Sequence, residues 1–357
     1  MHSLGAGPRA GRRSGRRSPL LPILCAIAVL LSTLTATPTP TAQAAPARQG
    51  TSTPAADAPG QPPRNPRRLR RIRHLPGTVR FRTFRLSSEA GLLHPNAPDI
   101  AHAGRAGAPL LLFLPATGAI PQDYRRILTV AVRLGYSVLG LDYWNLGASV
   151  TRTCRSVADC YTRLQRNRFT GQDPGRFSRV NAANSIRHRL LLALRVLKAK
   201  DPNGGWANYF HGTTIRWGHI VLAGHSQGGG ESAFISHSHR VRGVLMFSSP
   251  VETYDDVVAS WMEHPGKTPA RDMYALDSTN DIYADRIVRS WPHLGLNRLG
   301  ATHTARTPTG SHRLVTTLHL GDPHQAHDRT ATDATPLTHS GTPKLQRTWR
   351  WMLEQTL

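Results

Sequence analysis

The stretch that decides the fold is residues 220–234, "IVLAGHSQGGGESAF". Four apolar residues typical of a buried strand lead into a small polar turn, and a helix-compatible stretch follows. Ser226 lies at the centre of the G-x-S-x-G pattern formed by residues 224–228. In this pattern a serine occupies a strained strand-to-helix turn, and the flanking glycines let strand and helix approach each other. The stretch therefore predicts a nucleophilic serine exposed on a sharp turn.

From residue 78 onward, the sequence alternates between predicted strands and predicted helices. Apolar runs typical of strands buried on both faces occupy residues 109–115, 136–143, 219–223, 243–249 and 272–276. Residues 78–86 alternate like an outer strand, and 313–320 form a last strand. Helices are predicted at 121–135, 184–200, 228–237, 281–291 and 343–357. This order predicts an α/β protein with a mostly parallel central sheet and helices on both faces.

Residues 1–44 have the layout of an export signal. They contain arginines but no acidic residue, an apolar run at 20–34, and the small-x-small cleavage site Ala42-Gln43-Ala44. The apolar run is shorter than the ~18–20 residues that a bilayer span needs, and it contains Pro22. We therefore expect a secreted or envelope-associated protein without a transmembrane segment in its mature form, with the general and twin-arginine export routes both open.

Residues 45–77 are rich in proline, alanine and arginine, and predict a disordered basic linker before a catalytic domain at 78–357. The chain is strongly basic, with a formal net charge of +24. Contact of the basic N-terminal segment with anionic envelope polymers is one interpretation, and a solvated spacer is the other; no specific nucleic acid is expected. Cys154 and Cys160, six positions apart, predict a disulfide in an exported chain. No second cysteine pair completes a metal site, so we expect neither metal nor cofactor.

A serine nucleophile needs a base, and the base needs an acid to orient it. On this architecture the three follow in the order serine, acid, histidine, with the acid after a strand. Asp281 is favoured because it lies in a predicted loop before a helix. Asp277, at the end of the strand, and Glu252, after the preceding strand, are alternatives.

The base is harder to choose because the chain has 18 histidines. It is expected in the loop between the last strand and the last helix, where His324, His327 and His339 lie, whereas His312 and His319 belong to the strand. His327 is favoured, with His324 as its main rival.

An oxyanion hole requires two backbone N–H donors. The first is expected to be Gln227, directly after the nucleophile. The second is expected in the loop after the strand at 109–115, where Thr117 is favoured and Ala116 is the alternative. Tyr143 and Trp144 follow the end of another strand, and either line the site or serve as packing.

From about residue 109 to the C-terminus, the chain resembles the α/β-hydrolase superfamily. More narrowly, it resembles a bacterial family of exported serine hydrolases in "LFLPATG", "LGLDYWN", the two cysteines, "GHSQGGG", "MFSSP", "STND" and "AHDRTATD". This resemblance places nucleophile, acid and base on Ser226, Asp281 and His327. "GHSQGGG" is also similar to bacterial lipases and polyester hydrolases, although "PATG" stands where many lipases carry His-Gly.

Together these features predict a secreted serine hydrolase that cleaves carboxylic esters, like a carboxylesterase or lipase, through a Ser-His-Asp triad. Two alternatives remain open at this point. The first is a cell-envelope acyltransferase or an amidase/peptidase on the same fold, and the second is a non-catalytic basic protein that binds the envelope.

Overall fold

The computed structural model describes residues 78–87, 93–299 and 311–357, which all belong to one compact unit, Arg64–Leu357. The predicted export signal at 1–44 and linker at 45–77 lie outside the described residues. No helix within the described ranges is long and apolar enough to cross a bilayer.

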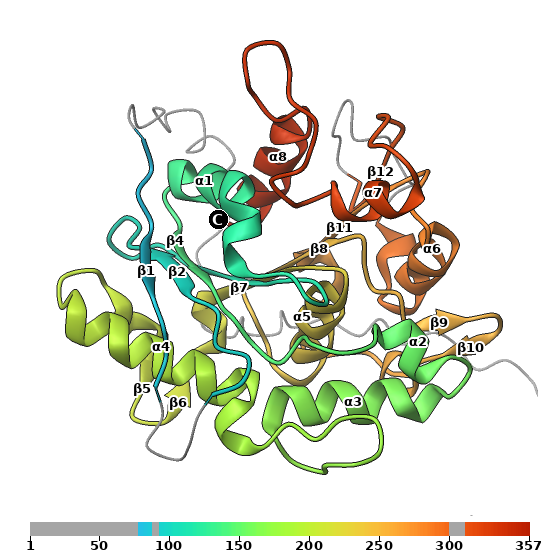
Figure 1. Ribbon diagram of the computed structural model, residues 1–357, viewed down its shortest axis with the longest axis horizontal. Coiled ribbons are helices and arrows are strands. Elements are labelled where there is room, and N and C mark those ends of the chain that lie inside the picture. Colours follow the sequence, from blue (N-terminus) through green and yellow to red (C-terminus); the bar gives the residue numbers. More distant parts are fainter. Residues whose placement is uncertain (1–77, 88–92, 300–310) are drawn as a thin grey trace, which may run out of the picture. The chain divides into compact units, whose positions relative to one another are not determined.

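Eight strands form the central sheet in the order β1-β2-β4-β3-β7-β8-β11-β12 (Figure 1). They are β1 (Arg82–Phe84), β2 (Asp99–His102), β3 (Leu110–Leu114), β4 (Ser137–Gly140), β7 (Ile220–His225), β8 (Gly243–Phe247), β11 (Met273–Ser278) and β12 (Arg313–Thr316). Strand β2 is antiparallel to both of its neighbours, and all other pairs are parallel. This sheet, with a strand–serine–helix turn at its central strand β7, confirms the predicted α/β-hydrolase fold.

The helices cover both faces of this sheet (Figure 1). They are α1 (Arg125–Leu134), α2 (Val150–Cys154), α3 (Ala158–Thr170), α4 (Ile186–Lys200), α5 (Gln227–Ser238), α6 (Ala284–His293), α7 (Pro323–Asp328) and α8 (Gln346–Thr356). Two two-stranded sheets lie outside the central one, namely β5 (Phe210–His211) with β6 (Thr214–Ile215), and β9 (Thr253–Tyr254) with β10 (Val257–Val258).

Two hydrophobic cores explain why the central strands read as continuous apolar runs. Alternate side chains of β3 enter different cores: Leu112 packs in the core that contains residues of α3, α4 and α5, whereas Phe113 packs in the core that contains α1 and α8. Every position of the strand is therefore buried, as expected of a parallel sheet covered on both sides.

No helix or strand is predicted for residues 144–183, yet this part of the chain contains two helices. The segment that carries the cysteine pair forms the two helices α2 and α3, which are joined by the expected disulfide between Cys154 and Cys160. The buried side of α3 includes the polar residues Gln165, Asn167 and Arg168. The helix consequently lacks the apolar stripe by which an amphipathic helix is recognised in sequence. Strand β2, which has four residues, also escaped prediction.

Candidate active site

Ser226 occupies the turn between β7 and α5 in a strained backbone conformation. Its φ is 52° and its ψ is −117°, which a residue with a side chain rarely adopts. The turn is held because the Ser226 N–H donates to the carbonyl of Phe247 on β8 over 2.9 Å, and the Ser226 carbonyl accepts from two N–H groups of α5. This geometry is the sharp turn that the G-x-S-x-G pattern predicts.

Gly224 and Gly228 allow strand β7 and helix α5 to cross at close range. A Cβ on Gly224 would lie 2.2 Å from the backbone of Gly228, and a Cβ on Gly228 would lie 2.0 Å from the carbonyl oxygen of Leu114 on β3. Both distances are far below van der Waals contact and involve backbone atoms, which do not move aside easily. The turn therefore requires glycine at both positions.

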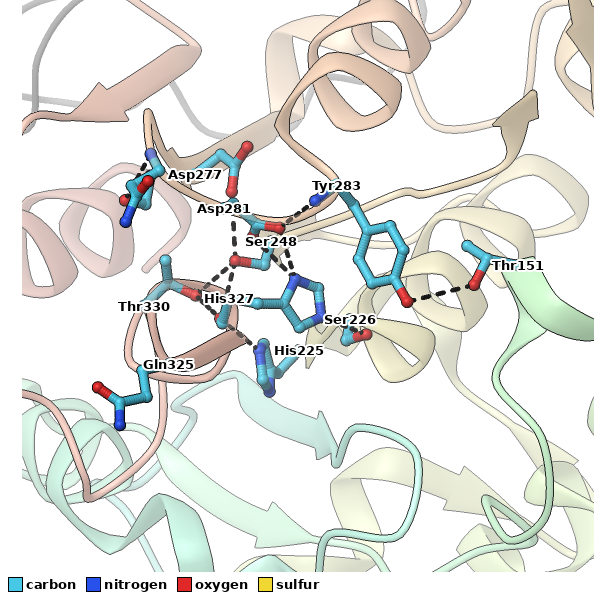
Figure 2. Close-up of polar contacts among 12 residues, drawn as sticks. Thr151, His225, Ser226, Ser248, Asp277, Asp281, Tyr283, Gln325, His327 and Thr330 are labelled. Carbon is cyan, nitrogen blue, oxygen red and sulfur yellow. Dashed lines mark hydrogen bonds and ion pairs between the residues drawn. The ribbon is translucent and has the colours of Figure 1, made fainter. Parts of the chain in front are cut away.

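The structure brings Ser226, His327 and Asp281 into one hydrogen-bonded chain (Figure 2). The Ser226 hydroxyl lies 2.8 Å from Nε2 of His327, and Nδ1 of His327 lies 2.8 Å and 2.9 Å from the two carboxylate oxygens of Asp281. In a neutral imidazole, Nδ1–H then donates to Asp281 and Nε2 accepts from the serine hydroxyl. This tautomer leaves the Ser226 hydroxyl beside a nitrogen that can accept its proton.

His327 lies on the short helix α7 rather than in the predicted loop. Pro323 occupies the first turn of this helix, and the Asp322 side chain caps it by accepting from the N–H of Gln325. His327 is buried, whereas its rival His324 on the same helix is exposed, as is His339. Among these three histidines, only His327 is hydrogen-bonded to Ser226.

Asp281 follows β11 in the turn before α6, as predicted. Burial alone would raise the pKa of Asp281, but hydrogen bonding and attraction to His327 lower that pKa below its usual value. The carboxylate also accepts from the N–H of Tyr283 over 2.7 Å. Asp281 is therefore ionised and fixed in place to orient His327.

The two alternative acids, Asp277 and Glu252, lie in surroundings that differ from those of Asp281. Asp277 is fully buried in β11 beside Asp281, and burial, followed by the negative charge of Asp281, raises its pKa well above the usual value. Asp277 accepts from the Ser248 hydroxyl over 3.3 Å, and its interaction with Asp281 contributes to raising the pKa of Asp277 and to lowering that of Asp281. Glu252 contacts Trp261 and Gln165 in a separate buried cluster, where burial raises its pKa to about 7.

His225 and Tyr124 form a second buried layer that the sequence did not predict. The Tyr124 hydroxyl lies 3.0 Å from Nδ1 of His225, and Nε2 of His225 lies 3.0 Å from the backbone carbonyl of His327 (Figure 2 shows His225 and His327). Burial, followed by the nearby His327, lowers the pKa of His225 to about 3. A neutral His225 therefore accepts from Tyr124 and donates to the backbone of His327. The only signal in the sequence was its place between Gly224 and Ser226.

The candidate oxyanion donors belong to two segments, the start of α5 and the loop after β3. Gln227 begins α5, and the first N–H groups of a helix have no partner within that helix. The N–H of Ala116 donates to the Tyr124 hydroxyl over 3.0 Å and so is occupied, which leaves Thr117 as the favoured second donor. The Thr117 hydroxyl donates to the side-chain oxygen of Gln227 over 2.9 Å, joining the two donor segments.

The two aromatic residues after β4 have different surroundings. Tyr143 is fully buried and donates to the carbonyl of Pro115 over 2.8 Å, so it serves as packing rather than as a pocket wall. Trp144 packs edge-on against His94. In the described part of the chain, no group of three or more His, Cys, Asp or Glu side chains is arranged to hold a metal ion.

Comparison with protein-family models finds no match for this chain, and neither does comparison with curated proteins. Among solved structures, the chain is similar to the acylaminoacyl peptidase of Pyrococcus horikoshii, with 11% identity and a TM-score of 0.38 over 71% of this chain. It is also similar to an acylaminoacyl peptidase in complex with Z-Gly-Gly-Phe-chloromethyl ketone, with 13% identity and a TM-score of 0.35 over 70% of this chain. The matches cover 41% and 40% of those two chains, so this chain spans about two fifths of their length.

Proposed function

We propose that this protein is a serine hydrolase that cleaves carboxylic esters through a covalent acyl-enzyme. The observation that carries the proposal is the hydrogen-bonded chain from Ser226 through His327 to Asp281, which begins on a strained strand-to-helix turn. A strained turn of this kind is costly to fold, and such strain is concentrated at functional sites. A serine in an ordinary glycine-rich loop would need neither the strain nor the aligned base.

In the first half-reaction, Ser226 attacks the ester carbonyl while His327 takes the hydroxyl proton. Asp281 stabilises the imidazolium that forms. The oxyanion of the tetrahedral intermediate accepts hydrogen bonds from the N–H groups of Gln227 and Thr117, and the N-terminus of α5 adds a favourable dipole. The intermediate collapses when His327 gives its proton to the leaving alcohol, and the acyl group remains on Ser226.

In the second half-reaction, His327 removes a proton from water, which attacks the acyl-enzyme. The second tetrahedral intermediate then breaks its bond to the serine oxygen, which recovers its proton from His327. The products are the free acid and the regenerated enzyme. No step requires a group other than water and the five residues named.

The test is hydrolysis of short-chain nitrophenyl esters by the purified protein and by Ser226→Ala. We expect the substitution to lower kcat by about 10³- to 10⁶-fold while the melting temperature stays close to that of the wild type. Equal turnover by both proteins would contradict the assignment of the nucleophile. Product analysis with added alcohols, amines and peptide substrates separates hydrolysis of esters from acyl transfer and from amide cleavage on the same site.

We also propose that the protein is exported and that its basic N-terminal segment contacts anionic envelope polymers. The support lies in the sequence of residues 1–77, which lie outside the described part of the structure. N-terminal sequencing of the protein from culture medium tests the cleavage after Ala44. Salt-sensitive retention on anionic polymers, lost when residues 45–77 are deleted, tests the contact.

A further inference from the structure

A pocket of about 490 Å³ lies beside the Ser226–His327–Asp281 site and is rich in arginine. Its volume falls within the range of small-molecule binding sites. We call it the arginine pocket and define it by the side chains of Thr151, Arg152, Arg155, Tyr254, Tyr283 and Arg286. Its lining joins the segment around α2, the β9–β10 hairpin and helix α6.

Tyr283 connects the arginine pocket to the proposed base. Its ring packs edge-on against the His327 ring, with centroids 5.2 Å apart, and its hydroxyl lies 3.5 Å from the hydroxyl of Thr151 (Figure 2). Tyr283 thus both lines the arginine pocket and contacts the proposed base, His327. Tyr283 also donates its backbone N–H to Asp281 over 2.7 Å, so the arginine pocket adjoins both partners of the proposed nucleophile.

The arginine pocket carries three guanidinium groups, and no Asp or Glu side chain occurs among its lining residues. Arg286 is held in place, because Nη2 donates to the Tyr161 hydroxyl over 3.1 Å and the guanidinium lies 4.9 Å from the centroid of the Tyr254 ring. Such a fixed, half-buried guanidinium loses little freedom when it binds a further partner. Arg152 and Arg155 add two exposed charges.

The disulfide anchors the other two arginines. Arg152 lies on α2 and Arg155 directly follows it, while the bond from Cys154 to Cys160 ties this short helix to α3. The nearest acid in sequence, Asp159 on α3, pairs instead with Arg163 at 3.8 Å. The positive charge is therefore held near the site on a covalently braced segment.

We propose that the arginine pocket binds a negatively charged group of the substrate, so that the preferred substrates are anionic esters rather than neutral ones. This inference rests on the proposed ester hydrolysis and names the substrate class. Planar guanidinium groups pair with carboxylates through two parallel hydrogen bonds, which gives both affinity and orientation. Positive potential in a cleft also raises the encounter rate with anions.

The experiment compares kcat/KM for two matched pairs of esters. In the first pair, nitrophenyl hemiglutarate carries a carboxylate at the end of its acyl group, where nitrophenyl pentanoate carries a methyl group. In the second pair, acetoxybenzoate carries a carboxylate on its alcohol side, where tolyl acetate carries a methyl group. We expect the anionic member of at least one pair to react about tenfold faster or more. The pair that discriminates shows which side of the ester enters the arginine pocket. The preference shrinks at high ionic strength because salt screens exposed charges.

The double variant Arg152→Gln/Arg155→Gln tests the residues directly. Both side chains are exposed, so the fold tolerates the change. We expect kcat/KM for the preferred anionic ester to fall about tenfold while that for its neutral partner stays within twofold. Arg289→Gln is the matched control, since Arg289 is exposed on the same helix as Arg286 but does not line the arginine pocket.

A binding measurement separates failure of this inference from failure of the proposed function. Calorimetric titration of Ser226→Ala with the four esters requires no turnover, and it tests the arginine pocket even if the wild type cleaves none of them. Tighter binding of an anionic ester, lost in the added Arg152→Gln/Arg155→Gln background, supports the inference. Wild-type cleavage of neutral esters at rates equal to those of their anionic partners, together with equal binding, would overturn it and leave the proposed ester hydrolysis intact.

Discussion

At the scale of the residue, the site depends on side chains that set the protonation and position of others. Asp281 stays ionised chiefly because His327 lowers its pKa, whereas burial raises the pKa of the neighbouring carboxyl Asp277. His225 stays neutral and holds the backbone of His327. These supporting residues lead to two predictions that differ from those for the nucleophile itself.

The first prediction concerns Asp277. Because its folded-state pKa is raised above the usual value of 3.8, its contribution to stability is present at acidic pH and is lost as the pH rises above the unfolded value. An asparagine at this position would not titrate, could still donate to Asp281, and could accept from Ser248. We therefore expect Asp277→Asn to melt a few degrees higher than the wild type at neutral pH, with the difference vanishing near about pH 4.

Circular dichroism melts across this pH range check the prediction. Asp277→Leu is the control, because it removes the hydrogen bond to Asp281 and is expected to lower kcat, whereas Asp277→Asn is expected to retain most of it. If the two variants lost equal activity, the proposed hydrogen bond from Asp277 would have no role in orienting Asp281.

The second prediction concerns His225. Replacement by leucine removes the donor to the His327 carbonyl, and small displacements of a catalytic base cost up to about 100-fold in rate. We expect His225→Leu to lower kcat by about 10- to 100-fold with little change in KM, and His225→Gln to recover part of the loss because its amide can still donate. Steady-state kinetics on one neutral ester measure both parameters.

The same substitution, His225→Leu, is expected to reduce the loss of stability at acidic pH. The folded-state pKa of His225 is about 3 against 6.5 for the unfolded chain, so the unfolded state gains a proton first as the pH falls. The wild type therefore loses stability between about pH 6.5 and pH 3. A pH series of urea unfolding that showed equal acid sensitivity in His225→Leu would contradict the buried neutral histidine.

At the scale of the element, the crossing of β7 and α5 positions Ser226. A methyl group on Gly228 would collide with the backbone of β3. We expect Gly228→Ala to destabilise the protein by about 3 kcal/mol or more, or to prevent folding, since overpacking against backbone cannot relax by rotating a side chain. The control is Gly218→Ala, where the added Cβ meets no atom within 4 Å. Urea unfolding of the three proteins gives the comparison, and equal stability would show that the turn tolerates a side chain.

A second prediction at this scale concerns the disulfide between α2 and α3. Closing a loop of this length stabilises a protein by about 2 kcal/mol on the loop-entropy model. We expect Cys154→Ser/Cys160→Ser to melt roughly 5 °C lower. Because α2 carries Arg152, we also expect the preference for anionic esters to weaken more than turnover of neutral ones. Unchanged melting and an unchanged preference would show that α2 is held by other contacts.

At the scale of the whole molecule, much of the architecture follows from local patterns. The buried strands and the helices α1, α4, α5, α6 and α8 were predicted because each has its own apolar period or flanking glycine and proline. The order of the strands in the sheet was not predicted, because strand pairing depends on contacts between segments that are distant in the sequence. Helix α3 was missed since polar side chains such as Gln165 and Asn167 occupy its buried side, and α2 was missed because it has only 5 residues.

The candidate site likewise contains residues that the sequence predicts and residues whose roles arise only in the folded chain. Ser226 is read from a local motif, and the chain order of the fold restricts the acid and the base to a few positions. The choice among them depends on burial and orientation, which place His327 toward Ser226 and leave His324 exposed. The roles of Tyr124, His225 and Asp277 arise only in the folded chain, where Tyr124 meets a partner 101 positions away.

Ser226 alone is proposed to become the covalent nucleophile. Treatment of the folded protein with a fluorophosphonate probe, followed by digestion and mass spectrometry of the peptides, tests it directly. We predict one probe group on the peptide that contains Ser226, and no adduct on the Ser226→Ala variant. An adduct on another residue of the wild type, equal labelling of the variant, or no labelling of a folded wild type would contradict it.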